Sequence, residues 1–124
     1  MKKAFMLIIA ALICLSACKK VEFSDKLNDS HNKWLTFRNQ SNNSYSYTAY
    51  TGSVLGNHIE TKITVTNGKV TAREYIAGTY KPNTADLVIS ETWIENESSL
   101  NTHTNSGAFK MRTLDQVYTK AKSI

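Results

Sequence analysis

The sequence predicts a small α+β protein with an N-terminal helix, an antiparallel sheet of about four strands built around an Asn-Gly hairpin, and a C-terminal helix. Three observations predict it: helical spacing of apolar residues near the start, alternation of apolar and polar residues in the middle, and a helix-capping sequence near the end. The order α-β-β-β-β-α favours helices on a single face of one sheet. The composition of the 124 residues, 41% hydrophobic and 20% charged, excludes a disordered chain.

The first helix is predicted over residues 25–40. Four residues recur at intervals of four, three and three positions, as on one helical face: Leu27, His31, Trp34 and Phe37. Ser24 is the expected N-cap, and the polar run 39–44 is expected to end the helix.

Strands are predicted over 44–51 and on both sides of Asn67-Gly68, with a turn at 52–57. Asn-Gly favours a two-residue type I′ turn, in which both central residues have positive φ. Such a loop sets the register and places three pairs on one face: Val65 with Val70, Ile63 with Ala72, and Ile59 with Ile76.

A fourth strand is predicted over 87–94 and a polar loop over 96–107. Thr113-Leu-Asp-Gln116 has the pattern of a capping box, in which the Thr and Gln side chains bond each other's backbone N–H. It predicts a last helix with these residues on one side: Leu114, Val117, Tyr118 and Ala121.

The first eighteen residues have the features of a secretory leader. Lys2 and Lys3 precede an apolar run over 4–15, which as a helix would reach only about 18 Å and is too short to span a hydrocarbon core of about 30 Å. Leu15-Ser16-Ala17-Cys18 resembles the lipobox of bacterial lipoproteins. The resemblance implies removal of residues 1–17 and acylation of Cys18, followed by a short tether over 18–24 and one domain over 25–124.

Acylation would restrict what the mature protein can do. Cleavage of the leader removes Cys14, Lys2 and Lys3, which lowers the net charge from +5 to +3. The Cys18 thiol is then modified by lipid. No thiol then remains for a disulfide, a metal or nucleophilic catalysis. The expected partners are the membrane, through the lipid, and an envelope protein or an anionic ligand, with no nucleic acid. Because Lys19 follows the cysteine where Asp would retain a lipoprotein in the inner membrane, we expect the outer membrane, facing the periplasm, if the host has two membranes.

The sequence has no spacing typical of a catalytic or metal site. His31, His58 and His103 are far apart, so no metal and no cofactor are expected. Residues 52–56 lack the G-x-S-x-G spacing of a nucleophile turn. Several aromatic residues could line a sugar or peptide groove, although core packing is favoured: Trp34, Tyr45, Tyr47, Trp93 and Tyr118.

The predicted hairpin register places Lys62 opposite Arg73 on the outer face. Like charges that face each other destabilise a sheet, so a compensating group is expected. It is either Glu60, diagonal to Arg73, or an anionic ligand or lipid headgroup bound by Lys62 and Arg73.

The order of several short motifs resembles a family of small bacterial secreted proteins and lipoproteins built around a domain of unknown function. The motifs are Trp34, 45–48 (YSYT), 63–70 (ITVTNGKV), Arg73, 92–95 (TWIE), His103 with Gly107, and 113–118 (TLDQVY). The resemblance implies no activity. The sequence departs from the family in one respect, because relatives continue with further strands where this chain ends at Ile124. The resemblance singles out four polar positions, which form either a buried network that braces the long loop or an active site: Arg73, Glu95, His103 and Asp115.

Two classes of function follow from these observations. One is a non-enzymatic, lipid-anchored envelope protein that binds or supports another envelope component. The other is a small hydrolase or metal-assisted enzyme that uses His103 with Glu95, Asp115 or Arg73. The two differ in whether His103 meets a carboxylate in a cleft.

Overall fold

The computed structural model describes residues 22–104 and 106–124. The predicted leader, Cys18 and the first residues of the tether lie outside these residues. The chain divides into two compact units, of which the first ends at Phe37 and the second comprises Arg38–Ile124. Each unit is described by itself.

Within the described residues, no helix combines the length and the apolar character needed to cross a membrane.

Residues 22–40 are helical, as the spacing of the apolar residues predicts. The prediction that Ser24 is the N-cap is wrong, because the backbone is already helical at residues 22–24 and an N-cap residue is not. Lys26 pairs with Glu22 one turn earlier, at 2.6 Å, which supports the helix before Ser24. The polar run ends the helix as expected, and Asn42 and Asn43 there have φ of 51° and 52°.

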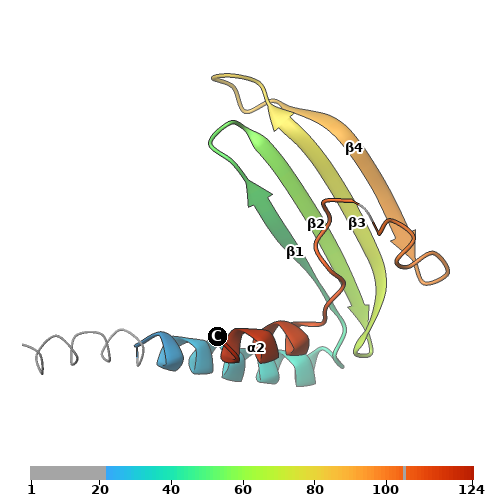
Figure 1. Ribbon diagram of the computed structural model, residues 1–124. Helices are drawn as coiled ribbons and strands as arrows, with labels where there is room; N and C mark the ends of the chain where they lie inside the picture. Colours follow the sequence, from blue (N-terminus) through green and yellow to red (C-terminus); the bar gives the residue numbers. More distant parts are fainter. Residues whose placement is uncertain (1–21, 105) are drawn as a thin grey trace, which may run out of the picture. The chain divides into compact units, whose positions relative to one another are not determined.

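The second unit contains a four-stranded antiparallel sheet and a C-terminal helix, which confirms the α+β class. The strands follow one another in the order β1-β2-β3-β4 (Figure 1). Their bounds are Tyr45–Gly52 for β1, Asn57–Thr66 for β2, Lys69–Tyr80 for β3 and Leu87–Asn96 for β4. The helix, α2, comprises Leu114–Lys122.

The Asn67-Gly68 turn has the predicted geometry. Both residues have positive φ, 48° and 78°, and the flanking Thr66 and Lys69 pair with each other. Asn67 and Gly68 also donate backbone hydrogen bonds to the Ser44 hydroxyl and the Asn43 carbonyl, at 2.9 and 2.8 Å. The turn is therefore fixed both by its own residues and by the segment that precedes β1.

Beyond the first pairs, the predicted hairpin register is wrong. Val65 pairs with Val70 as expected, but Thr64 pairs with Ala72, which leaves Thr71 as an extra residue in a β-bulge. Every later pair is displaced by one position, so Ile63 faces Arg73 and not Ala72, and Ile59 faces Ala77 and not Ile76. The sequence pattern does not reveal the bulge, because Val70, Ala72 and Ile76 alternate regularly.

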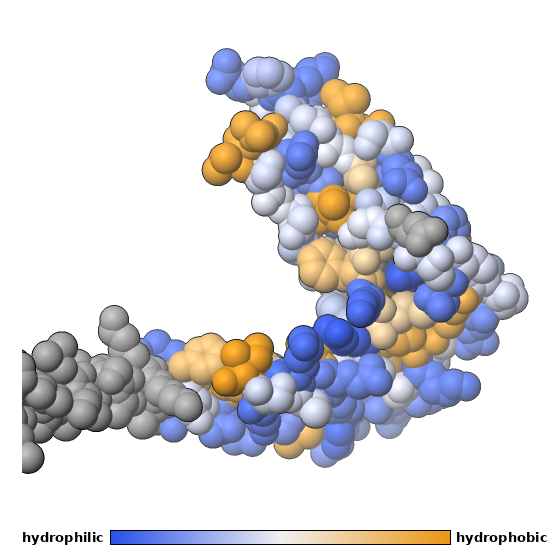
Figure 2. Space-filling model, in the orientation of Figure 1, coloured by the Kyte–Doolittle hydropathy of each residue, from blue (hydrophilic) through white to orange (hydrophobic). Residues whose placement is uncertain are grey.

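The displaced register determines which β3 residues are buried. Ile63 and Val65 of β2 and Tyr75 of β3 form the apolar core of the sheet's inner face. Because the bulge changes the alternation, Arg73 shares this face with them, whereas Glu74 lies on the outer face opposite Lys62. Hydrophobic residues also occur outside the core, for example at the β1–β2 turn, where Val54 and Leu55 are exposed (Figure 2).

The capping box at Thr113 and Gln116 is present with both of its hydrogen bonds, as the sequence predicts. However, α2 does not cover the sheet. It lies beyond the end of the sheet where β1 begins (Figure 1), held by the Leu114 N–H, which donates to the Tyr45 hydroxyl at 2.8 Å. The expectation of helices on one face is therefore wrong for α2. The segment between β4 and α2 crosses the inner face in its place.

Replacing Gly68 with Val should destabilise the fold by more than about 1 kcal/mol, because a β-branched residue is strained at φ 78°. A Cβ at this position would also lie 2.7 Å from Nδ2 of the Asn43 side chain. Thermal or urea unfolding measures the effect. Lys69→Val, one residue further on in the strand, is the matched control and should be close to neutral. Equal stability of the two variants would contradict the turn assignment.

Candidate functional site

A buried carboxylate at the end of β4 is the centre of the candidate site. Glu95 is 0% exposed, and its two oxygens accept hydrogen bonds from four residues: Arg73, Asn101, Thr102 and His103. Arg73 binds through Nε and Nη2, both at 3.0 Å, in the two-pronged geometry that favours guanidinium–carboxylate pairs. The backbone N–H groups of Asn101 and His103 donate at 3.0 and 2.8 Å, and His103 Nδ1 lies 3.1 Å away.

The strand register brings the two charges together. Arg73 and Glu95 are direct partners across β3 and β4, and both point to the inner face. Without the bulge at Thr71, the alternation of β3 would place Arg73 on the outer face. The bulge is therefore the local feature that positions the ion pair.

The Glu95 carboxylate stays ionised down to low pH. Burial by itself raises its pKa, but the hydrogen bonds from Arg73 and from the His103 and Asn101 N–H groups outweigh burial and lower the pKa from 4.5 to about 2. The charge is thus balanced within the protein.

Trp93 forms an aromatic stack beside the carboxylate. The His103 ring lies 4.2 Å from the Trp93 ring and within 5° of parallel to it, and Tyr75 stacks at 4.9 Å. The Arg73 guanidinium lies 4.9 Å from the centre of the Trp93 ring, a cation–π distance. These contacts hold His103 in one orientation, with Nδ1 towards Glu95.

The same network ties the β4–α2 segment to the sheet. Arg73 donates to the carbonyl oxygens of His103 and Phe109, at 3.4 and 3.3 Å. The Phe109 N–H donates to the hydroxyl of buried Thr61 on β2, at 3.1 Å. The segment is therefore held over β2 and β3. On the edge strand β1 it contacts Tyr47, and the inner face beyond this residue remains uncovered.

A groove of about 610 Å³ lies along this uncovered part. Its lining comes from β1, the β4–α2 segment and α2: Tyr47, Ala49, Thr51, Gly107, Ala108, Phe109, Lys110, Arg112 and Val117. Tyr47 donates from its hydroxyl to the Arg112 carbonyl at 2.6 Å, which closes one end. A second, more polar hollow of about 430 Å³ borders Arg73 and His103.

The structure brings together three of the four predicted polar residues: Arg73, Glu95 and His103. Asp115 is elsewhere, at the start of α2, and pairs with Arg38 at 3.0 Å. A position in the first turn of a helix suits a carboxylate, so Asp115 has a local role there.

The premise of an anion site at Lys62 and Arg73 is wrong. The two residues lie on opposite faces of the sheet, because the bulge pairs Lys62 with Glu74, at 3.0 Å. The repulsion that would have required a compensating anion is absent, and Arg73 is occupied by Glu95.

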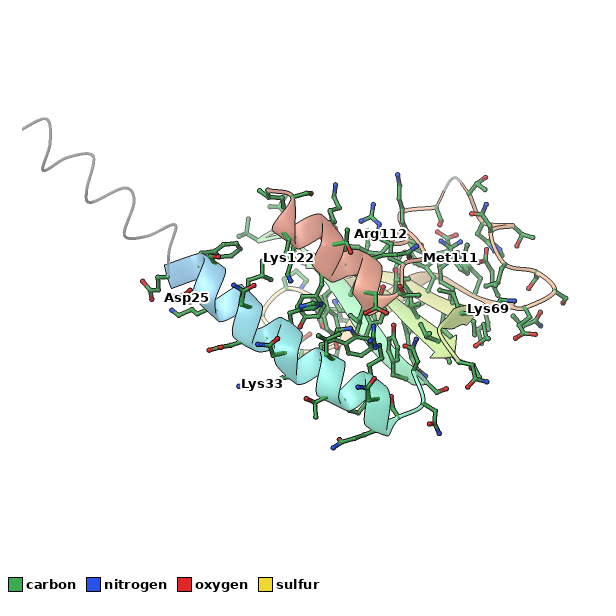
Figure 3. The ribbon with its side chains drawn as sticks, turned by 90° about the horizontal axis from the view of Figure 1, so that it is seen from below. Asp25, Lys33, Lys69, Met111, Arg112 and Lys122 are labelled. Carbon is green, nitrogen blue, oxygen red and sulfur yellow. The ribbon has the colours of Figure 1, made fainter. Side chains whose placement is uncertain are left out.

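Two basic residues of the groove, Lys110 and Arg112, were not predicted from the sequence. They lie on the irregular segment before α2, where no periodicity indicates which side chains share a surface. Figure 3 shows Arg112 and Met111 on this segment beside the sheet, and Lys69 apart from them at the β2–β3 turn. The only sequence signal was local basic charge, which is common on protein surfaces.

The described residues, 22–104 and 106–124, contain no group of three or more His, Cys, Asp or Glu side chains that could hold a metal ion. Comparison of the chain with protein-family models, curated proteins and solved structures finds no match. The resemblance to a family with a domain of unknown function therefore stays a prediction.

The low pKa of Glu95 predicts acid sensitivity. The difference between 4.5 and about 2 corresponds to about 3 kcal/mol of stability. Because the folded state has the lower pKa, this stability is present above about pH 5 and is lost as the pH falls towards about 2. We expect the wild type to lose about 3 kcal/mol more than Glu95→Gln over this range, measured by urea unfolding at each pH.

Glu97→Gln is the matched control, since Glu97 is exposed two residues further along the chain. It should retain the pH dependence of the wild type. At neutral pH, Glu95→Gln itself should cost about 3 kcal/mol, because it leaves Arg73 buried without its charge partner. Parallel pH profiles for the wild type and Glu95→Gln would contradict the assigned network.

Proposed function

We propose that this protein is a non-enzymatic binding module of the bacterial cell envelope, anchored by lipid on Cys18. The lipobox-like sequence supports the anchor. The groove along β1 supports the binding role, and it is the observation on which the proposal depends. The wall of this groove is held in place by the buried Glu95 network before any ligand arrives, which lowers the entropic cost of binding.

The geometry around Glu95 favours a structural role over a catalytic one. A carboxylate with 0% exposure and at least four donors has no free lone pair for a substrate, and its pKa is far below that of a general acid or base at neutral pH. The network therefore acts as a brace for the segment that forms the groove wall.

One observation favours the hydrolase alternative. His103 Nδ1 faces Glu95, and the His103 side chain is 41% exposed, so its Nε2 is placed as in a carboxylate-oriented general base. In the described part of the chain, the one hydroxyl within hydrogen-bond distance of the ring is that of Thr102, which lies 3.2 Å from Nδ1 and donates to the Ser99 carbonyl. No hydrogen bond among residues 22–104 and 106–124 joins His103 Nε2 to a hydroxyl.

An ester-hydrolysis assay distinguishes the two functions. With para-nitrophenyl acetate as substrate, His103→Ala and the control His58→Ala should show the same background rate as the wild type. Both variants should be checked for folding by circular dichroism. Loss of turnover in His103→Ala alone, with the fold retained, would establish the enzyme.

The anchor predicts that the mature protein begins at an acylated Cys18. Mass spectrometry of the N-terminal peptide from the membrane fraction should show the lipid mass on this residue. Cys18→Ser should accumulate with its leader attached. An unmodified Cys18, or an N-terminus elsewhere, would contradict the anchor.

The sorting prediction concerns Lys19. In a host with two membranes, the wild type should fractionate with the outer membrane and Lys19→Asp should move towards the inner membrane. Lys20→Asp is the control and should move less. No movement of Lys19→Asp would count against the outer-membrane placement.

A further inference from the structure

The groove along β1 is lined by apolar residues and by basic residues, and this combination indicates the class of its ligand. Ala49, Ala108 and Val117 provide apolar surface, and the Phe109 and Val117 side chains are exposed, at 37% and 38%. Apolar side chains left accessible in a concave surface are typical of ligand sites. The volume of about 610 Å³ lies within the range of about 300–1,000 Å³ common for small-molecule sites.

The charged residues that line the groove are all basic. Lys110 and Arg112 border the groove, and no Asp or Glu is among its lining residues. Neither side chain has an ion-pair partner among residues 22–104 and 106–124. The nearby Asp115 is paired with Arg38. The groove therefore presents two uncompensated cations beside an apolar floor.

Tyr47 and Arg112 lie together at one end of the groove. Its pKa is raised by burial and by the neighbouring Tyr45, whereas the Arg112 guanidinium acts in the opposite direction. The guanidinium is thus close enough to affect a negative charge at the Tyr47 hydroxyl. The backbone of Arg112 is held at this end, since its carbonyl oxygen accepts the 2.6 Å bond from Tyr47.

We propose that the groove binds a monomeric amphipathic carboxylate with a linear acyl chain. The chain packs on Ala49, Phe109 and Val117, and the carboxylate interacts with Lys110 and Arg112. This inference rests on the proposed binding role of the groove and deepens it by naming the class of ligand. A neutral apolar molecule would leave both cations without a partner, and a fully polar anion would leave the apolar floor exposed to water.

The test uses the chain from residue 18 to 124 with Cys18→Ser, which cannot be acylated. Its result is therefore independent of the anchor. Decanoate binding can be absent although Cys18 is acylated in cells, and it can be present although Cys18 is not acylated. The probe is anilinonaphthalene sulfonate, an apolar aromatic anion whose fluorescence rises on binding. Decanoate below its micelle concentration is the competitor, and decanol is the uncharged comparison.

We expect decanoate to displace the probe and decanol to do so at least about tenfold less well. Lys110→Gln and Arg112→Gln should each weaken decanoate binding about threefold, and both together about tenfold, as expected for exposed ion pairs. Lys69→Gln is the matched control at the β2–β3 turn and should bind like the wild type. Ala49→Leu, which fills the floor, should abolish displacement.

Three results would overturn the proposal. Decanol could compete as well as decanoate, which would show that the cations play no part. The double variant could bind like Lys69→Gln, which would place the ligand elsewhere. An extended acidic peptide or anionic phosphatidylglycerol vesicles could bind where decanoate does not, which would identify the surface as a strand-pairing edge or a membrane contact. Circular dichroism of each variant ensures that loss of binding is not loss of fold.

Discussion

The buried ion pair of Arg73 and Glu95 is the interaction on which the second unit depends. A carboxylate without solvent contact is stable only when its charge is neutralised and its lone pairs are satisfied. Glu95 meets this condition by collecting donors from β3 and from two backbone N–H groups of the following loop. In doing so it fixes the loop, and through Arg73 and Phe109 it fixes the segment over β2. The open groove beside β1 is a consequence of where that segment is held.

The ion pair in turn depends on a single extra residue. The bulge at Thr71 changes which side chains of β3 face inwards. This change places the paired Arg73 and Glu95 on the inner face and gives Lys62 the partner Glu74. A charge that would be solvated on the outer face becomes part of the core. The cost of burying it is offset by the hydrogen bonds that it donates to the loop.

The fold class, the hairpin turn and the capping box could be predicted because each is encoded by neighbouring residues. Asn67-Gly68 has the backbone freedom that its turn requires, and Thr113 and Gln116 satisfy each other's N–H groups. The register beyond Val65 could not be predicted, since the alternation of apolar residues fits both registers. Only the burial of Arg73 opposite Glu95 distinguishes them, and this is a tertiary contact.

The candidate site was predictable to a similar extent. Arg73, Glu95 and His103, which the sequence analysis grouped, are joined by contacts at 2.8–3.1 Å. Asp115 does not join this group, because it lies in the first turn of α2 and pairs with Arg38. Lys110 and Arg112 were missed because a segment without regular structure gives no pattern from which a shared surface can be inferred. Their arrangement depends on the hydrogen bond from Phe109 to Thr61, which joins residues far apart in the sequence.

Native-state hydrogen exchange of Glu95→Gln tests the central claim, that Glu95 holds the loop and the groove wall in place. The account predicts that the amides of Asn101, His103 and Phe109 lose at least about tenfold more protection than those of Ile63 and Val65, which report the stability of the whole sheet. Glu97→Gln should leave all of them unchanged. If Asn101, His103 and Phe109 keep their protection relative to the sheet in Glu95→Gln, the loop is held by other contacts and the account is contradicted.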